Sequence, residues 1–266
     1  MVKPKVLVFS GYGLNCEEET KYAFDKAGGN AEIVHINDLI DGLKKLADYQ
    51  ILAFPGGFAY GDDTGSGNAY ANKVKNHLWP QMEKFLKQDK LIIGICNGFQ
   101  ILACLGLLPA VEGKFGQREM ALMNNESARY SDRWVDLKVE NDSVWLKNFS
   151  GFPVAIAHGE GRFFLSAANL AKLKKNNQVA LRYEIGEITT YQNLPANPNG
   201  AIDNVAGVTD KSGRILGLMP HPERAMFFTQ LPNWPLLKEQ LKRVKKPIPT
   251  EGPGLQIFKN GVNYFK

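Results

Sequence analysis

The sequence predicts an α/β protein with a doubly wound, mostly parallel sheet and an antiparallel extension. Strand-like and helix-like segments alternate through the first 108 residues, and the strand-like segments are continuously apolar. Continuously apolar strands joined by helices are typical of a parallel sheet that is covered on both faces. The length of 266 residues is compatible with one such unit.

The first half of the chain predicts four strands and four helices. The strands are expected at residues 5–10, 31–36, 50–57 and 90–95, and the helices at residues 17–29, 38–49, 68–87 and 97–108. Sheets of this kind bind ligands beyond the carboxyl ends of their strands. We therefore expect the functional side chains in the loops that follow these strands.

The second half predicts a different arrangement. Its β-like runs are shorter and lie at residues 133–139, 152–159, 161–166, 178–184, 204–210 and 214–221. We expect them to form an antiparallel extension of the same domain. A helix is predicted from Trp234 to about residue 245, and the Pro/Gly-rich residues 246–266 are expected to be extended. The domain prediction is residues 1–233 for the main domain and residues 234–266 for a C-terminal helix and tail.

Composition and charge argue against several classes of protein. A net charge of +5 with 22% charged residues is ordinary for a soluble globular protein. The basic run at residues 241–247 has no interleaved aromatic residues and does not indicate nucleic-acid binding. Cys16, Cys96 and Cys104 have neither disulfide-framework nor metal-ligand spacing. With no signal-like or membrane-spanning segment, we expect a cytoplasmic protein without a metal site.

The sequence around Cys96 predicts a nucleophile. Cys96 follows a buried strand, precedes a helix and lies between Gly94 and Gly98. Glycines on both sides of a sharp strand-to-helix turn relieve backbone crowding, as in hydrolases that carry a serine there. The helix N-terminus favours the thiolate form. Cys104 lies among apolar residues within the helix and is expected to be structural.

A cysteine nucleophile needs a base, and the chain has four histidines. We expect His35 to be structural and His77 to be exposed, whereas His158 remains a candidate. His221 lies between two prolines after the last apolar strand, and Glu223 follows two residues later. In an extended His-Pro-Glu segment the two side chains point to the same side, so the carboxylate would hold the imidazole in one tautomer.

An oxyanion hole is predicted beside the nucleophile. The glycine loop at residues 54–63 follows the third strand, which neighbours the fourth. The backbone N–H groups of Gly57 and Asn97 are candidates to converge on one oxygen atom. A Gly-Gly pair is also compatible with an ordinary turn.

These motifs together resemble a known family. The segments GGFAYGD, GICNGFQIL, AHGEGR, NPNG and MPHPERA resemble the class I (triad) glutamine amidotransferases, whose fold is flavodoxin-like, and among them the glutaminase subunit of phosphoribosylformylglycinamidine synthase. The resemblance runs from the first strand to about Phe228. It implies that Cys96 is the nucleophile, His221 the base and Glu223 the orienting acid, with Gly57 and Asn97 in the oxyanion hole.

The resemblance implies further residues and partners. Gln100, Asn124, Ser127 and Arg129 would contact the glutamine substrate, and His158 and Glu160 would lie near a synthetase interface. The synthetase subunit would carry ATP and Mg²⁺, because this chain has no G-x-x-x-x-G-K-[ST] loop. A small third subunit can belong to the complex. The pattern departs from the family at Ala201, where the family has a serine.

Two alternatives stay open at this point. A related Cys-His-Glu hydrolase, such as a γ-glutamyl hydrolase or a cysteine peptidase, would use the same triad on another substrate. A non-catalytic regulatory subunit would keep the fold without turnover, although the intact triad argues against that interpretation.

Overall fold

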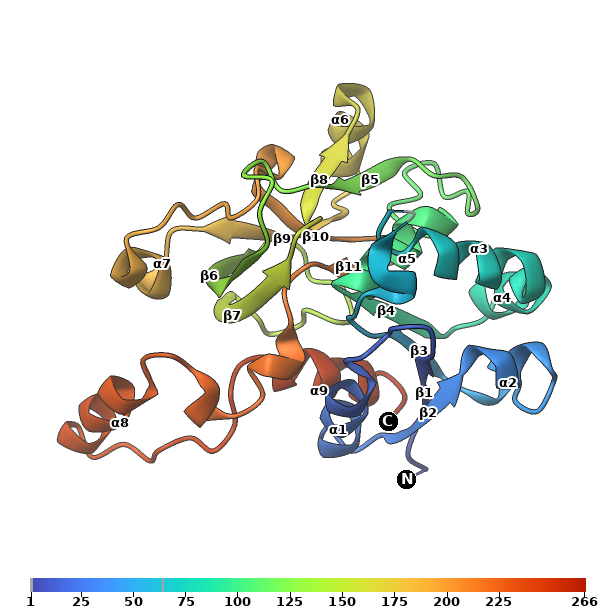
Figure 1. Cartoon of the computed structure of the whole chain (residues 1–266). Coiled ribbons are helices and arrows are strands. Elements are labelled where there is room, and N and C mark those ends of the chain that lie inside the picture. Colours follow the sequence, from blue (N-terminus) through green and yellow to red (C-terminus); the bar gives the residue numbers. More distant parts are fainter. Residues whose placement is uncertain (1, 64) are drawn as a thin grey trace.

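The protein is built around one nine-stranded mixed sheet (Figure 1). The computed structural model describes residues 2–63 and 65–266. The strand order is β2-β1-β3-β4-β11-β10-β9-β6-β7. The strands from β2 to β11 in this order are parallel, and those from β10 to β7 pair in antiparallel fashion. The predicted fold class and its antiparallel extension are therefore confirmed.

The strands of the main sheet are short and deeply buried in its parallel half. Their bounds are β1 Lys5–Ser10, β2 Asn30–His35, β3 Ile51–Phe54, β4 Leu91–Ile95, β6 Ser131–Val139, β7 Gly151–His158, β9 Val179–Glu184, β10 Val205–Thr209 and β11 Ile215–Leu218. A second, two-stranded sheet consists of β5 Met120–Met123 and β8 Arg162–Leu165. Among the described strands β8 pairs only with β5, in antiparallel fashion, so the predicted run at residues 161–166 lies beside the main sheet and outside it.

Helices cover both faces of the parallel half. Their bounds are α1 Glu17–Lys26, α2 Ile36–Ile40, α3 Asn68–His77, α4 Trp79–Leu86, α5 Asn97–Leu105, α6 Ala167–Lys175, α7 Glu187–Gln192, α8 Trp234–Arg243 and α9 Leu255–Asn263. α1 and α9 lie together on one face, and α3 and α5 lie on the other (Figure 1). Within the described residues, no helix combines the length and the hydrophobicity that crossing a membrane requires.

Two predicted helices are shorter than expected because specific residues interrupt them. The predicted helix at residues 68–87 is two helices, α3 and α4, that meet at Leu78. Pro80 lies in the first turn of α4, where its missing N–H costs nothing, but it could not continue α3. The predicted helix at residues 38–49 is replaced by α2 and a 3₁₀ turn, Leu46–Asp48, with Gly42 at φ 76° after α2.

The C-terminal tail contains a buried helix, so the prediction of an extended tail is wrong. Prolines and glycines are concentrated before Leu255, and α9 begins directly after them. Its apolar residues lie on one face and enter the core beside α1: Leu255, Ile257, Phe258 and Val262. Gly261 lies within this helix because a Cβ there would come within 2.5 Å of the Trp145 ring. The domain boundary after residue 233 stays a prediction.

We expect the Phe258→Ala variant to lose about 3–5 kcal/mol of unfolding free energy, because a buried aromatic ring is removed. Phe258 is fully buried and meets Phe24 edge to face, with ring centroids 5.0 Å apart. Urea unfolding monitored by tryptophan fluorescence measures the change. Leu236→Ala, on the exposed side of α8, is the control and should change the value by less than about 0.5 kcal/mol. A loss below about 1 kcal/mol for Phe258→Ala would show that α9 is dispensable for the core.

Candidate active site

Cys96 lies at a strained turn between β4 and α5. Its φ of 51° and ψ of −108° are outside the regions that a side chain normally allows. The Cys96 N–H donates to the Leu218 carbonyl oxygen at 2.8 Å, and the Cys96 carbonyl oxygen accepts from the Phe99 and Gln100 N–H groups. The backbone therefore fixes the thiol at the carboxyl edge of the parallel strands, as the sequence predicted.

The two glycines around Cys96 are required by close packing. A Cβ on Gly98 would lie 1.9 Å from the Phe54 carbonyl oxygen, and one on Gly94 would lie 2.6 Å from Leu102 Cδ1. Real Cβ atoms do not approach other atoms so closely, so any larger residue would push α5 away from β3. The Cys96 side chain is nearly buried, and its Sγ lies 3.7 Å from the Ala157 carbonyl oxygen.

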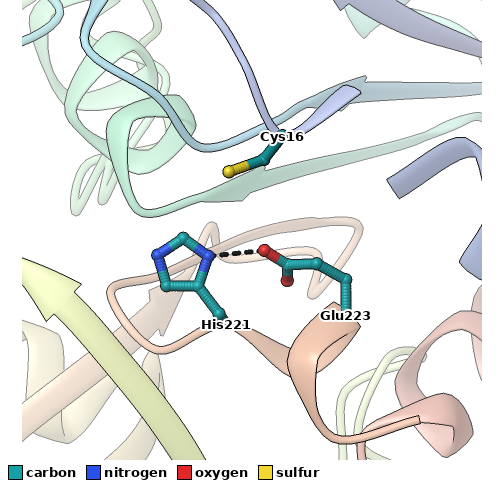
Figure 2. A group of neighbouring side chains, drawn as sticks. All are labelled: Cys16, His221 and Glu223. Atoms are coloured by element: carbon teal, nitrogen blue, oxygen red, sulfur yellow. Dashed lines mark hydrogen bonds and ion pairs between the residues drawn. The ribbon is translucent and has the colours of Figure 1, made fainter. Parts of the chain in front are cut away.

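His221 and Glu223 form a buried pair after β11. His221 Nδ1 lies 2.5 Å from Glu223 Oε1, and both side chains are 1% exposed (Figure 2). The His221 N–H donates to the Ala155 carbonyl oxygen at 2.8 Å, which ties this loop to β7. The predicted contact is present, but its expected geometry is wrong: Pro222–Arg224 is a 3₁₀ turn instead of an extended segment.

The surroundings of His221 favour its protonated form. Burial alone would lower the pKa of this imidazole, but the Glu223 carboxylate and Cys96 outweigh it and raise the pKa to about 10. In the part of the chain that the structure describes, His221 Nε2 has no hydrogen-bond partner. The arrangement holds a proton on His221 at neutral pH, and that proton is available for an atom bound beside Cys96.

The glycine loop after β3 lies against the turn at Cys96. Asn97 Oδ1 accepts from the Ala59 N–H at 3.1 Å, and Asn97 Nδ2 donates to Asp62 Oδ1 at 3.3 Å. Gly57 is packed so tightly that a Cβ would lie 2.5 Å from the Gly13 carbonyl oxygen. Because β3 and β4 are neighbours, Gly57 in the loop after β3 lies near the carboxyl end of β4, where Asn97 begins α5. The oxyanion hole stays a prediction.

Gln100 joins this loop to the turn after β7. Its Oε1 accepts from Asn97 Nδ2 at 2.8 Å, and its Nε2 donates to the Glu160 carbonyl oxygen at 2.6 Å. Glu160 Oε2 accepts from the Ser66 N–H at 3.1 Å. Both ends of the Gln100 side chain are therefore held by hydrogen bonds, and each end keeps capacity for one further bond.

His158 is buried at the end of β7 instead of exposed at the surface. Its Nδ1 lies 3.1 Å from Asn125 Oδ1, and its Nε2 has no hydrogen-bond partner. Burial and the nearby His221 lower the pKa of His158 to about 4, so its imidazole is neutral at pH 7. The interface role suggested for His158 stays a prediction.

The segment at residues 124–130 contains a buried asparagine beside the three predicted substrate contacts, which stay predictions. Asn124, Ser127 and Arg129 are exposed. Asn125, which the sequence analysis passed over, is buried and also donates to the carbonyl oxygens of Arg129 and His158. Burial raises the pKa of the adjacent Tyr130 above its usual value.

Two further residues adjoin the triad. Cys16, in the loop after β1, has its Sγ within 4.8 Å of ligand atoms of His221 and Glu223. Arg224 Nη2 lies 3.6 Å from the same sulfur. Both residues follow the carboxyl end of a parallel strand. This position in the sequence is the signal that could have identified them.

The other two histidines lie apart from the site: His35 accepts a hydrogen bond from the Asn37 N–H at the start of α2, and His77 is exposed.

Comparison with known proteins agrees with this geometry. The family model for the CobB/CobQ-like glutamine amidotransferase domain matches residues 3–265. The chain belongs to this family. The resemblance expected from the sequence is therefore confirmed, and the chain is identified as a member of an enzyme family that acts through a glutamine amidotransferase domain.

Individual relatives match over nearly their whole length. The chain is 53% identical to phosphoribosylformylglycinamidine synthase subunit PurQ of Methanococcus maripaludis, covering 98% of both chains. It is 42% identical to the PurQ subunit of Dehalococcoides mccartyi, covering 99% of this chain and 98% of the relative. A chain in the structure of PurLQS from Thermotoga maritima is 30% identical, with a TM-score of 0.71 and complete coverage of both chains.

The buried His158 predicts a pH dependence of stability. Its pKa of about 4 lies below that of a histidine in the unfolded chain, so the unfolded state binds one more proton between about pH 6.5 and pH 4. Unfolding free energy should therefore fall as the pH falls through this window, by about 3 kcal/mol in total from this group.

We expect the His158→Asn variant to lose this contribution, because asparagine does not titrate. Urea unfolding of both proteins at several pH values between 7 and 4 measures the difference in slope. His77→Asn, at the exposed end of α3, is the matched control and should retain the wild-type slope. Equal slopes for wild type and His158→Asn would contradict the assignment of a neutral, buried imidazole.

Proposed function

We propose that this chain is the glutaminase subunit of a phosphoribosylformylglycinamidine synthase. In this proposal it hydrolyses L-glutamine to glutamate and ammonia, and a synthetase subunit consumes the ammonia. The observation that carries the proposal is the buried His221–Glu223 pair acting on a cysteine that is held at a strand-to-helix turn. Full-length relatives at 53% and 42% identity that are named as this subunit support the substrate and the pathway.

The first half of the reaction forms a thioester. The Cys96 sulfur attacks the carboxamide carbon of glutamine, and the carbonyl oxygen takes up the negative charge. Backbone N–H groups of Gly57 and Asn97 are the proposed donors to that oxyanion, which would supply the largest stabilisation of the transition state. When the C–N bond breaks, His221 donates its proton to the departing nitrogen, and ammonia leaves. The raised pKa of His221 supports this order, because the residue begins the cycle as an acid.

The second half hydrolyses the thioester. Neutral His221 now accepts a proton from water, and the oxygen of that water attacks the thioester carbon. The C–S bond breaks, glutamate is released and the starting protonation state is restored. Glu223 stabilises the imidazolium at each stage and keeps Nδ1 oriented away from the nucleophile.

The proposal includes a partner that completes the reaction. The synthetase subunit would bind ATP and Mg²⁺ and use the ammonia to convert formylglycinamide ribonucleotide to the amidine, with a small third subunit in the complex. Glu160 and the neighbourhood of His158 are the proposed docking region, and Asn124, Ser127 and Arg129 the proposed glutamine contacts. We place the complex in the cytoplasm, where ATP and glutamine are available.

Removing the nucleophile should abolish glutamine hydrolysis. We expect the Cys96→Ala variant to lose about 10⁶-fold in kcat, the loss seen when a triad nucleophile is removed. Cys104→Ala is the matched control and should keep wild-type activity, because Cys104 packs within α5. Glutamate release by the purified chain in complex with the synthetase measures both. Activity of Cys96→Ala near that of Cys104→Ala would eliminate the triad mechanism.

Neutralising the acid should slow the reaction while leaving the loop in place. The Glu223→Gln variant retains a hydrogen-bonding side chain but loses the charge that raises the pKa of His221. We expect kcat to fall by roughly 10⁴-fold, by comparison with serine triads. Circular dichroism checks that the fold is retained. Wild-type turnover would reassign Glu223 to a purely structural role.

The partner should activate the glutaminase, since free hydrolysis would waste glutamine. We expect low glutaminase activity for the chain alone and strong activation when synthetase, ATP and formylglycinamide ribonucleotide are added. Ammonium salts should restore amidine formation by a complex that contains Cys96→Ala, because ammonia then bypasses the thioester. Full turnover of γ-glutamyl peptides by the chain alone would instead support the γ-glutamyl hydrolase alternative.

A further inference from the structure

A third side chain with metal-binding chemistry lies against the catalytic pair. The Cys16 Sγ and ligand atoms of His221 and Glu223 all lie within 4.8 Å of one another. Cys16 comes from the loop after β1, whereas His221 and Glu223 come from the loop after β11 (Figure 2). All three side chains are at most 3% exposed. The mechanism proposed above uses His221 and Glu223 but gives no role to Cys16.

Backbone contacts hold Cys16 in this position. The N–H groups of Asn15 and Cys16 both donate to the Gly56 carbonyl oxygen, at 3.2 and 3.1 Å. A Cβ on Gly56 would lie 2.8 Å from His221 Cε1 and 3.1 Å from the Cys16 sulfur. A glycine at position 56 therefore gives the thiol and the imidazole the space to lie beside each other.

The cluster contains polar atoms without partners. Glu223 Oε2 and His221 Nε2 are buried and accept or donate no hydrogen bond within the described chain. A buried carboxylate oxygen without a partner is costly, and a bound cation is one way to satisfy it. The partnerless Glu223 oxygen is the observation, independent of the thiol, that points to a ligand.

The donor set matches a thiophilic divalent cation. Thiolate, imidazole and carboxylate are the three ligand types of zinc sites, and a site with three protein ligands leaves a fourth position for water. Two anionic ligands would neutralise a dication in this buried space. With metal–ligand bond lengths of about 2.0–2.3 Å, the ligand atoms of a tetrahedral site lie about 3.4–3.6 Å apart. Side-chain shifts of about 1 Å would bring the three ligand atoms to this spacing. Burial and the Glu223 carboxylate raise the pKa of the Cys16 thiol well above its usual value, and Arg224, 3.6 Å from the sulfur, offsets this only in part. Binding of the cation would therefore release the thiol proton to solvent.

We propose that Cys16, His221 and Glu223 form an inhibitory site for a divalent cation of the zinc type. The cation would displace the proton from His221 Nδ1 to solvent and coordinate the nitrogen lone pair that this frees, and Glu223 would exchange its hydrogen bond to Nδ1 for the cation. His221 could then no longer be oriented for proton transfer, so occupancy would switch the glutaminase off. The inhibition rests on the proposed function, whereas the binding itself does not.

The binding is tested directly with Co²⁺, which replaces zinc and gives a thiolate charge-transfer band when sulfur is a ligand. The full-length chain is titrated as wild type and as Cys16→Ser, Cys96→Ala and Cys104→Ser. We expect one Co²⁺ per chain with a thiolate band in wild type, Cys96→Ala and Cys104→Ser. In Cys16→Ser the band should disappear and the affinity should fall at least about tenfold.

A band that persists in Cys16→Ser but is lost in Cys96→Ala would place the metal on the nucleophile and overturn the proposal. Absence of any thiolate band in wild type would also overturn it. If the proposed function failed but the site were real, Cys96→Ala would still bind Co²⁺ with a thiolate band, so the two failures are distinguishable. For active protein, Zn²⁺ inhibition that EDTA reverses should require at least about tenfold more Zn²⁺ in Cys16→Ser than in Cys104→Ser.

Discussion

The contact between Gly98 and the Phe54 carbonyl oxygen is the constraint on which the site depends. It allows α5 to pack directly over β3 and β4, with no room for a Cβ. Cys96, which directly precedes α5, has a positive φ and lies buried at the end of β4. The close packing of α5 on β3 also brings Asn97 to the loop after β3, where its Oδ1 accepts a hydrogen bond from the Ala59 N–H. One close backbone contact thus determines the positions of the nucleophile and of the loop beside it.

The parallel half of the fold was predictable because its signals are local. β4 is apolar at every position except a glycine, and its end is marked by the glycines around Cys96. The tail was not predictable by the same reasoning. The prolines and glycines that indicated an extended tail lie before Leu255. The helix α9 is stabilised by burial against α1, and that tertiary contact cannot be predicted from composition. Gly261 looks unfavourable for a helix until the Trp145 ring is placed beside it.

The parts of the site whose residues are close in sequence were predictable. The parts that depend on contacts between distant segments were less predictable. The spacing of His221 and Glu223 predicted their hydrogen bond, although the backbone between them is a 3₁₀ turn. Nothing in the sequence distinguishes Asn125 from Asn124, and only the approach of β7 buries the former. The residues around Cys16 in the sequence form no motif that indicates a site. Its neighbours in space, His221 and Glu223, are about 200 positions later in the chain.

The position of β11 has a consequence for how the enzyme is made. β11 lies between β4 and β10 in the sheet, yet the whole antiparallel half separates it from β4 in the chain. During synthesis the ribosome therefore releases Cys96, the proposed nucleophile, long before β11. That strand accepts the Cys96 backbone hydrogen bond and leads into His221, the proposed base. Pairing over such a sequence distance is late and slow. A nascent or truncated chain that ends before β11 lacks His221 and Glu223, so it cannot assemble the proposed triad.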